Sequence, residues 1–236
     1  MSEPEYEIDA PLIEEVFRLT NSDERTALPR HRHDLTREQV ETVQRARIIV
    51  ATAEVVTDVG YAEASSKAII DRAGVSSKTF YALFGDKESA FFAGFTLLDG
   101  PLVAIARNPP HPENPRQTTR DGIGAFLQQL AAAPLFARLR LVEGPGAGKR
   151  AMLREHEIFQ EFVRAFVVVI EAAREKDPRI TVPPNDVLML LMGGIRTTIA
   201  HHLVEHSAET LPSLQPTIVE SIERIVYGAV PELPGG

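Results

Sequence analysis

The sequence contains no cysteine, and this absence excludes two kinds of chemistry. Its 236 residues offer no side chain for a disulfide bond or for a thiolate metal site. A chain of this length buries a sizeable core without such covalent staples. The lack of cysteine fits a reducing compartment, so we expect a cytoplasmic protein.

Long hydrophobic runs and an export signal are also missing. No apolar run approaches the roughly 20 residues that a membrane span needs. Residues 1–10 carry four carboxylates and no basic residue, whereas a secretory signal needs a basic region followed by an apolar one. We therefore expect a protein with no membrane partner and no export.

Positive charge is scarce along the whole chain, whose formal net charge is -8. Residues 1–36 hold 4 Lys/Arg and 9 Asp/Glu, residues 37–90 hold 7 and 8, and residues 91–236 hold 14 and 16. No segment is basic overall, so composition alone argues against a nucleic-acid partner. Affinity for DNA would have to come from a few placed cations and from helix N-termini.

Helical periodicity dominates what is present. Apolar residues such as Ile48 and Val55 recur along one face of residues 36–59. A short apolar-periodic stretch, residues 12–19, predicts a helix docked on the body, and the proline-rich region 100–115 predicts a helix end and a loop. We expect helices over residues 36–59, 65–73, 76–84, 86–98, 118–132, 134–142, 148–176, 185–207 and 215–229, with no β-strand.

Residues 65–84 have the pattern of two short helices joined by a tight turn. Gly74 supplies the small, conformationally tolerant residue that the turn needs. Ile69, Phe80 and Phe84 can form the core between the two helices. The outer face of the second helix is short and polar, as entry into a DNA major groove requires. Together with the preceding helix, this pattern predicts a helix-turn-helix.

From Ile48 to Phe92 the sequence resembles the TetR family of bacterial regulators. The densest part of the match is AIIDRAGVSSKTFYALFGDKESAFF, which ends at Phe92. The resemblance implies an all-α fold with an N-terminal three-helix helix-turn-helix domain and a larger helical ligand-binding and dimerisation domain. The implied parts are an acidic N-terminal extension (1–36), the DNA-binding domain (37–90) and the ligand-binding and dimerisation domain (91–236).

The resemblance also implies which residues contact an operator in double-stranded DNA. The implied DNA-binding residues are Ser66, Lys67, Ser77, Lys78, Thr79, Tyr81 and Lys87. Lys78 and Thr79 are the best candidates for base readout, and the others would mostly position the protein on phosphates. An isolated lysine is more often a plain solvated side chain, and Tyr81 could instead be a core residue. The run from Arg30 to His33 could reach a minor groove as an arm, but we favour a polar linker.

In the second half, the resemblance implies a homodimer and a small-molecule effector. The dimer would form through residues 185–207 and 215–229, where Ile218, Ile222 and Ile225 lie on one stripe. Candidate residues of the effector pocket are Phe95, Phe126, Phe159, Phe162, Met192 and Arg196. A stripe of aromatic residues and methionines is by itself more often plain core. The alternative to a dimer is a single intramolecular core.

Two other motifs do not meet the requirements of the chemistry they suggest. The glycine-rich run before Lys149 has Glu143 where a phosphate-binding loop needs glycine, and no strand precedes it. His202 and His206 have the spacing of two zinc ligands on one helical face, but no third ligand is visible. We therefore expect no metal site and no cofactor. No catalytic triad or carboxylate pair stands out, so no catalytic residue is assigned.

The sequence therefore predicts a DNA-binding transcription regulator, not an enzyme. The family's usual member is a repressor that a small molecule releases from its operator. One alternative is an activator, or a regulator without a ligand, with the same fold. Another is a helical small-molecule-binding protein or enzyme that retains a vestigial DNA-binding domain.

Overall fold

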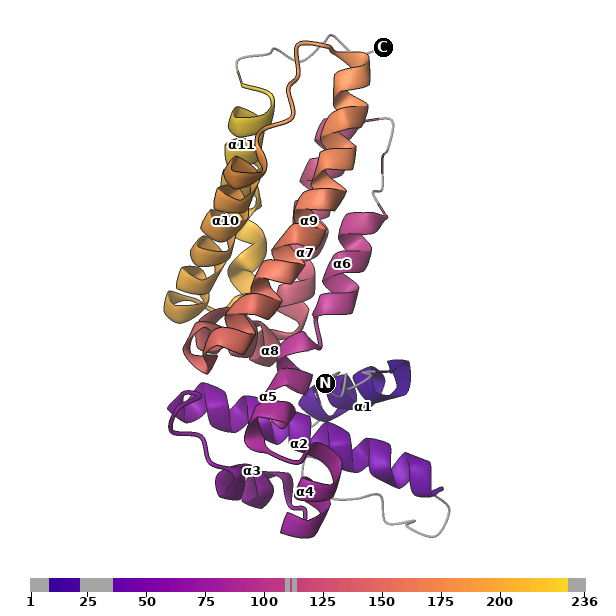
Figure 1. Cartoon of the computed structure of the whole chain (residues 1–236), viewed down its shortest axis with the longest axis vertical. Helices are drawn as coiled ribbons and strands as arrows, with labels where there is room; N and C mark the ends of the chain where they lie inside the picture. The colour runs from indigo at the N-terminus through magenta and orange to yellow at the C-terminus, as the bar shows by residue number, and fades with distance from the viewer. Residues whose placement is uncertain (1–8, 22–35, 109–110, 112–113, 229–236) are drawn as a thin grey trace. The chain divides into compact units, whose positions relative to one another are not determined.

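The computed structural model describes residues 9–21, 36–108, 111 and 114–228, and every regular element in these ranges is helical (Figure 1). This confirms the all-α fold. The chain forms two compact units: residues 1–98 with 138–148, and residues 99–137 with 149–236. The run from Arg30 to His33 lies outside the described residues.

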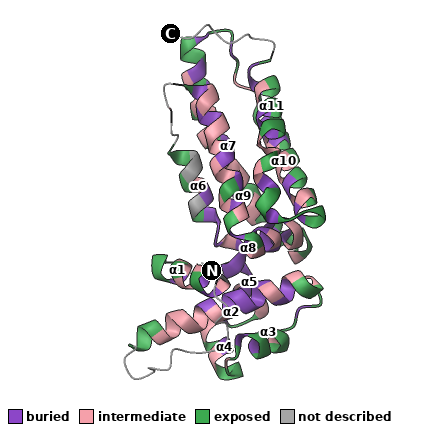
Figure 2. Ribbon diagram, turned by 180° about the vertical axis from the view of Figure 1, so that it is seen from behind, coloured by how far each residue is buried: buried purple, intermediate pink, exposed green. Residues whose placement is uncertain are grey.

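The first unit is built around the long helix α2. It comprises α1 (Ala10–Asn21), α2 (Arg37–Val59), α3 (Ser66–Ala73), α4 (Ser77–Phe84), α5 (Lys87–Thr96), the π-helix η1 (Leu139–Glu143) and the 3-10 helix η2 (Gly144–Ala147). Helix α2 packs against α1, α3 and α5, and its C-terminal half is buried around Ile48, Ile49 and Val56 (Figure 2). The predicted helix near residues 12–19 is confirmed as α1, which buries Leu12 and Val16.

Polar caps explain where four helices of this unit, α2 to α5, begin. The side chain of Thr36 accepts from the backbone N–H of Gln39, whose side chain in turn accepts from the N–H of Thr36. Ser65, Ser76 and Asp86 each accept a hydrogen bond from the backbone three residues on, at α3, α4 and α5 respectively. Such caps satisfy donors that have no partner within the helix.

Residues 138–148 return to the first unit although they lie 40 residues or more beyond its main segment. The buried guanidinium of Arg140 donates to the carbonyl oxygen of Phe95 at 2.9 Å and lies 4.7 Å from the centroid of the Phe95 ring. Gly144 lies against the same ring, because an added Cβ would be 2.7 Å from a Phe95 ring carbon. The predicted domains, 37–90 and 91–236, placed residues 138–148 in the second domain, whereas in the fold these residues pack with the first unit.

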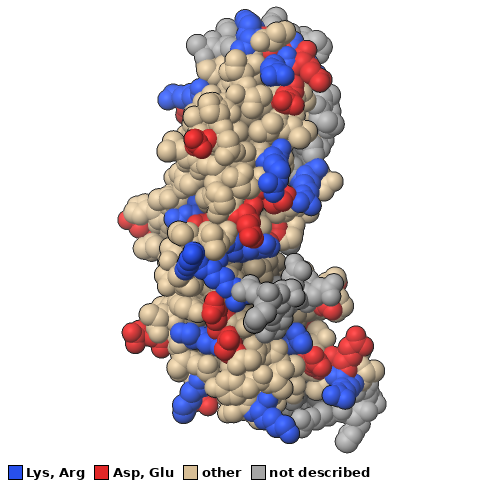
Figure 3. Space-filling view, in the orientation of Figure 1, with Lys and Arg blue, Asp and Glu red and all other residues tan. Residues whose placement is uncertain are grey.

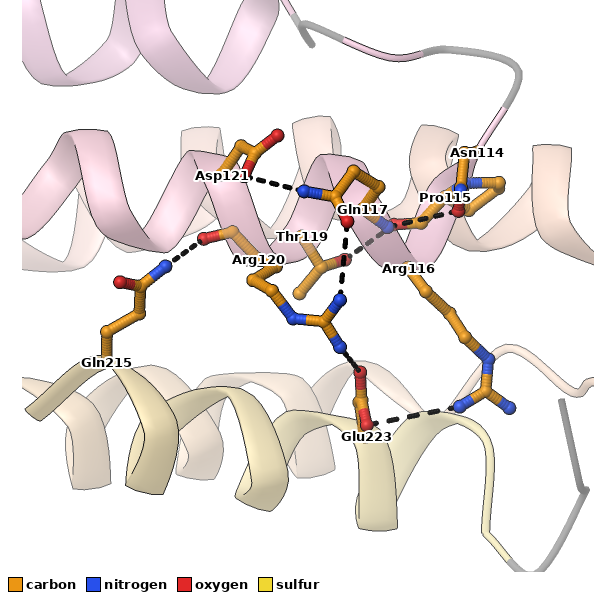
Figure 4. Close-up of polar contacts among 9 residues, drawn as sticks. All are labelled: Asn114, Pro115, Arg116, Gln117, Thr119, Arg120, Asp121, Gln215 and Glu223. Carbon is orange, nitrogen blue, oxygen red and sulfur yellow. Dashed lines mark hydrogen bonds and ion pairs between the residues drawn. The ribbon is translucent and has the colours of Figure 1, made fainter.

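The second unit is a bundle of α6 (Asp99–Arg107), α7 (Pro115–Ala132), α8 (Pro134–Arg138), α9 (Lys149–Lys176), α10 (Asn185–Glu205), the 3-10 helix η3 (Ala208–Leu214) and α11 (Gln215–Val226). Helix α7 contacts α6, α9, η3 and α11. Its N-terminal half is joined to α11 by a polar cluster around Glu223 (Figure 4). Arg120 lies 3.3 Å and Arg116 lies 4.0 Å from the carboxylate of Glu223, and Gln215 donates to the carbonyl oxygen of Arg120 at 2.8 Å.

We expected a helix end and a loop over residues 100–115, and the helical part is longer than the prolines suggested, because α6 occupies Asp99–Arg107. Pro101 is the third residue of this helix, where the missing N–H would have had no helical partner. The helix is also fixed to α9 by ion pairs at both ends, Asp99 with Arg154 at 3.0 Å and Arg107 with Glu161 at 2.6 Å. These partners lie more than 50 residues away in the sequence. Patterns among neighbouring residues therefore could not predict the two ion pairs.

Helix α10 is long and apolar enough, by length and composition, to cross a membrane, and only 22% of its most apolar window is buried within the chain. The uninterrupted apolar runs of this segment are short, so run length in the sequence did not indicate this property. Arg196 in the second half of the helix lies 3.5 Å from Glu155 of α9. A charged residue inside an apolar helix is expensive to place in lipid, so this ion pair favours a helix packed against protein.

Candidate DNA interface

Helices α3 and α4 are joined by the turn that the sequence predicted. Gly74 follows α3 in the left-handed conformation, with φ 60° and ψ 39°, and its N–H bonds back to the end of that helix. A side chain is strained in this region of backbone space. The chain therefore turns tightly from α3 into the N-cap residue Ser76, and α4 follows directly.

The two helices are held by an apolar core. Ile69 from α3 and Phe80 and Phe84 from α4 are all buried. The Phe80 ring packs edge-to-face on Tyr81, with centroids 5.2 Å apart, and lies 6.5 Å from Phe84. Because α4 is seated by these rings, its opposite face is presented to solvent in a fixed orientation.

The solvent-facing side of α4 is polar. Ser77, Lys78 and Tyr81 are exposed, and 53% of the Tyr81 surface is accessible, which excludes a core position for Tyr81 within this chain. Thr79 is half-buried, and its hydroxyl lies 2.9 Å from that of Ser76. A short polar helix on a rigid base has the dimensions to enter a major groove.

The two predicted DNA-binding residues at the start of α3, Ser66 and Lys67, differ in their exposure and in their partners within the chain. Ser66 is half-buried in the first turn. Lys67 is exposed but pairs with Asp71 at 2.6 Å, and the hydrogen bond to Asp71 and its charge raise the pKa of Lys67. The lysine therefore shares its charge with a carboxylate one turn away. Basic and acidic side chains are likewise interspersed on the visible face of this unit (Figure 3).

Lys87 has a structural role that the sequence did not reveal. Its ammonium donates to the carbonyl oxygens of Tyr61 and Ala64, each at 2.8 Å, and lies 4.4 Å from the centroid of the Tyr61 ring. The lysine thus holds the loop between α2 and α3 to the start of α5. The two acceptors precede it by more than 20 residues, and backbone carbonyls leave no signal in a sequence.

The candidate effector residues fall in both units. In the second unit, Phe126 of α7 and Phe162 of α9 meet edge-to-face with centroids 5.8 Å apart. The side chains of Phe159, Met192 and Arg196 are half-buried on α9 and α10. Phe95 is buried in the first unit, where its ring packs against neighbouring phenylalanines and Arg140.

The histidines at the C-terminal end of α10 form a polar cluster of their own. A ring nitrogen of His202 lies 2.7 Å from the hydroxyl of Thr210, and its ring centroid lies 4.7 Å from that of His206. Burial, followed by the nearby His206, lowers the pKa of His202. In the part of the chain that the structure describes, no group of three or more His, Cys, Asp or Glu residues is placed to hold a metal ion.

Comparison with known proteins identifies the first unit by its sequence. Residues 48–93 match the family described as bacterial regulatory proteins, tetR family. The matched segment covers the C-terminal part of α2 and all of α3 and α4, and it ends within α5. No curated protein sequence matches the chain.

Solved structures resemble the fold over most of the chain. The fatty acid degradation regulator FadR from Bacillus halodurans is 17% identical with a TM-score of 0.65, covering 80% of this chain and 97% of that one. The TetR family transcriptional regulator PfmR from Thermus thermophilus is 16% identical with a TM-score of 0.59, covering 74% and 97%. FadR from Bacillus subtilis in complex with stearoyl-CoA is 18% identical with a TM-score of 0.57, covering 77% and 97%.

Proposed function

We propose that this chain, which belongs to the TetR family of bacterial regulatory proteins, is a repressor released from its operator by a small-molecule ligand. The chain is a DNA-binding transcription regulator, and its family is one of regulators and not of enzymes. The observation that carries the proposal is the exposed polar face of α4 on its buried aromatic base. We place its action in the cytoplasm, where bacterial DNA lies.

The proposed contacts with DNA divide by role. Lys78 and Thr79 would read base edges, because they lie in the first turn of the recognition helix α4. The remaining contacts would go to phosphates or groove edges from Ser66, Lys67, Ser77, Tyr81 and Lys87. Two of the three protons on the Lys87 ammonium are already directed at carbonyls, so its phosphate contact would use the third.

We propose a homodimer through α10 and α11, within residues 185–207 and 215–229, of which residue 229 lies outside the described part. Leu190 is 76% exposed and Val204 is 61% exposed on α10. An added Cβ at Gly193 or Gly194 would meet nothing within 4 Å, so the single chain leaves this apolar helix face uncovered. A second copy would cover it, and helix-turn-helix dimers read two half-sites about 34–36 Å apart or multiples of that.

For the effector we propose a long-chain acyl compound. The support is the stearoyl-CoA bound by the structurally similar FadR of Bacillus subtilis and the aromatic pair Phe126–Phe162 between α7 and α9. Acyl chains bury against aromatic and methionine side chains without needing directional partners. Ligand would shift the population toward a dimer whose recognition helices are wrongly spaced for the operator, which requires different affinities for the two states.

The test is a fluorescence-anisotropy titration of the full-length protein with DNA from upstream of its own gene. We expect selective binding that weakens with salt and in the Tyr81→Phe variant, and that is released by stearoyl-CoA. Selective binding that stearoyl-CoA leaves unchanged would remove the acyl effector from the proposal and favour another ligand or a ligand-independent regulator. Tighter binding in its presence would favour an activator or a co-repressed regulator. Equally weak binding to every duplex would favour a ligand carrier with a vestigial DNA-binding domain.

A further inference from the structure

We propose that Arg47, on α2 and outside the helix-turn-helix proper, is a further contact to the phosphodiester backbone of the operator. The proposal rests on the DNA-binding function above and names a residue that completes the same interface. It rests on which cations of residues 37–90 are paired within the chain, on the position of one guanidinium, and on the space that Gly74 leaves for it.

Most cations of the DNA-binding segment are already committed within the chain. Residues 37–90 hold seven Lys and Arg residues against eight Asp and Glu residues. Arg45 pairs with Glu41 at 3.1 Å, and Lys67 pairs with Asp71. Arg72 bridges two carboxylates of α2, at 3.3 and 3.1 Å, and Lys87 is bonded to the two carbonyls described above.

Three cations of this segment remain without a hydrogen bond or ion pair to any described residue: Arg37, Arg47 and Lys78. A cation that is already paired must give up part of that pairing to bind a phosphate, whereas an unpaired one loses only its hydration. In a segment with no excess of positive charge, the unpaired cations are therefore the main source of attraction to DNA.

The side chain of Arg47 ends beside Gly74. Its Nη2 lies 2.6 Å, and its Cζ 3.8 Å, from the point where a Cβ on Gly74 would stand. Gly74 precedes the α4 N-cap residue Ser76 by two positions. The guanidinium of an α2 residue therefore lies at the turn, beside the N-terminal end of the recognition helix.

This position suits a phosphate better than a base edge. A guanidinium presents a planar fork of donors that matches phosphate oxygens, and the N-terminus of the neighbouring helix α4 adds partial positive charge. The side chain is half-buried, so it has fewer accessible positions than a fully exposed arginine before DNA binds. Because it comes from α2 and not from the outward face of α4, it would fix the protein's register on the duplex without reading sequence.

The experiment compares Arg47→Ala, Arg47→Lys and a matched control, Arg45→Ala, in the full-length protein. Arg45 lies on the same helix, two residues earlier, and is paired with Glu41. Each protein is titrated by anisotropy with its upstream DNA and with a scrambled duplex over a series of salt concentrations. Thermal unfolding is recorded in parallel for all variants.

We expect Arg47→Ala to weaken binding to both duplexes by a similar factor of about tenfold or more, as for the removal of a charge-assisted hydrogen bond. The slope of log affinity against log salt should become shallower by about 0.9 for each phosphate that is no longer neutralised, hence by about 1.8 for a dimer. Arg47→Lys should recover part of the affinity and most of the slope, since it keeps the charge. Arg45→Ala should bind DNA like the wild type.

Three results would overturn the assignment while wild-type protein still binds its upstream DNA selectively. The first is unchanged affinity and salt slope in Arg47→Ala. The second is a loss confined to the selective duplex, which would make Arg47 a base-reading residue. The third is a fall in melting temperature that matches the loss of binding and that lysine does not rescue, which would make it structural. Failure of wild-type protein to bind any duplex selectively would instead overturn the proposed function itself.

Discussion

At the residue scale, the first unit depends on a few side chains whose partners are distant in sequence. Lys87 closes the loop after α2 through two carbonyl oxygens, and Arg140 bonds to the last turn of α5 through the Phe95 carbonyl. Both cations lie where helix-end or loop carbonyls would otherwise lack donors. Lys87 and Arg140 therefore stabilise the folded unit through these hydrogen bonds. Lys78 differs from them because it bonds to no carbonyl oxygen among the described residues.

Lys78 and Lys87, two of the three lysines of the DNA-binding segment, should consequently respond differently to the same change. Lys87→Met keeps the apolar stem but removes the ammonium, so we expect a loss of about 1–2 kcal/mol of unfolding free energy for the partly exposed carbonyls left without a charged donor. Lys78→Met should leave stability within about 0.5 kcal/mol but weaken DNA binding. Urea unfolding and anisotropy on both variants make the comparison. Equal stability of the two variants would contradict the structural role of Lys87.

Gly74 gives a second prediction at this scale. Gly74→Ala should reduce the unfolding free energy by about 1–2 kcal/mol, because alanine is strained at φ 60°. The Arg47 guanidinium, as the end of a flexible side chain, should move aside at little extra cost. Gly146→Ala is the control, since an added Cβ there meets nothing within 4 Å and its φ is not positive. If urea unfolding shows both variants to be as stable as wild type, the turn does not require glycine.

At the scale of elements, segments far apart in sequence determine which helices act together. The long helix expected over residues 86–98 ends at Thr96, and a new helix starts at Asp99, where the chain passes from one compact unit to the other. Ion pairs hold α6 to α9 at both of its ends. In the first unit, η1 packs against α2 and α5. The last helical turns before α9 thus belong to the DNA-binding unit.

The contact between η1 and α2 should make stability depend on pH. Burial raises the pKa of Glu143, and the nearby Arg138 offsets this only in part. The folded protein therefore binds this proton more tightly than the unfolded chain does, so its contribution to stability falls as pH rises above the ordinary carboxyl pKa of about 4.3. We expect Glu143→Gln to be more stable than wild type at pH 7, with the difference vanishing near pH 4. Urea titrations at the two pH values test this, and no gain at pH 7 would contradict it.

At the scale of the whole molecule, the uncovered apolar surface of α10 is the main feature that one chain leaves unexplained. Leu190→Glu should convert the proposed dimer to a monomer in analytical ultracentrifugation and abolish selective DNA binding, because a single helix-turn-helix contacts one half-site. Val168→Glu on α9 is the matched control, since Val168 is an apolar residue that is also 66% exposed. A dimer that survives Leu190→Glu, or that Val168→Glu disrupts equally, would place the interface elsewhere.

Local signals in the sequence were enough to predict the helix-turn-helix. The helix starts near residues 76 and 86, the glycine at the turn and the apolar residues at helical spacing are signals that act over a few residues, and the structure has the two helices and the turn at these places. Because such signals are local, they did not predict α6. Proline suggested a loop there, but the helix is held by partners on α9 that no local rule includes.

Which charged residues are available to a partner became clear only from the folded chain. By sequence, Lys67, Lys78 and Lys87 are all candidate DNA-binding cations. In the fold, Lys67 is paired with a carboxylate and Lys87 is bonded to carbonyls, whereas Lys78 has no partner among the described residues and Arg47 from another helix reaches the turn. Charge and residue type belong to the sequence, but hydrogen-bond partners and burial depend on which segments the fold brings together.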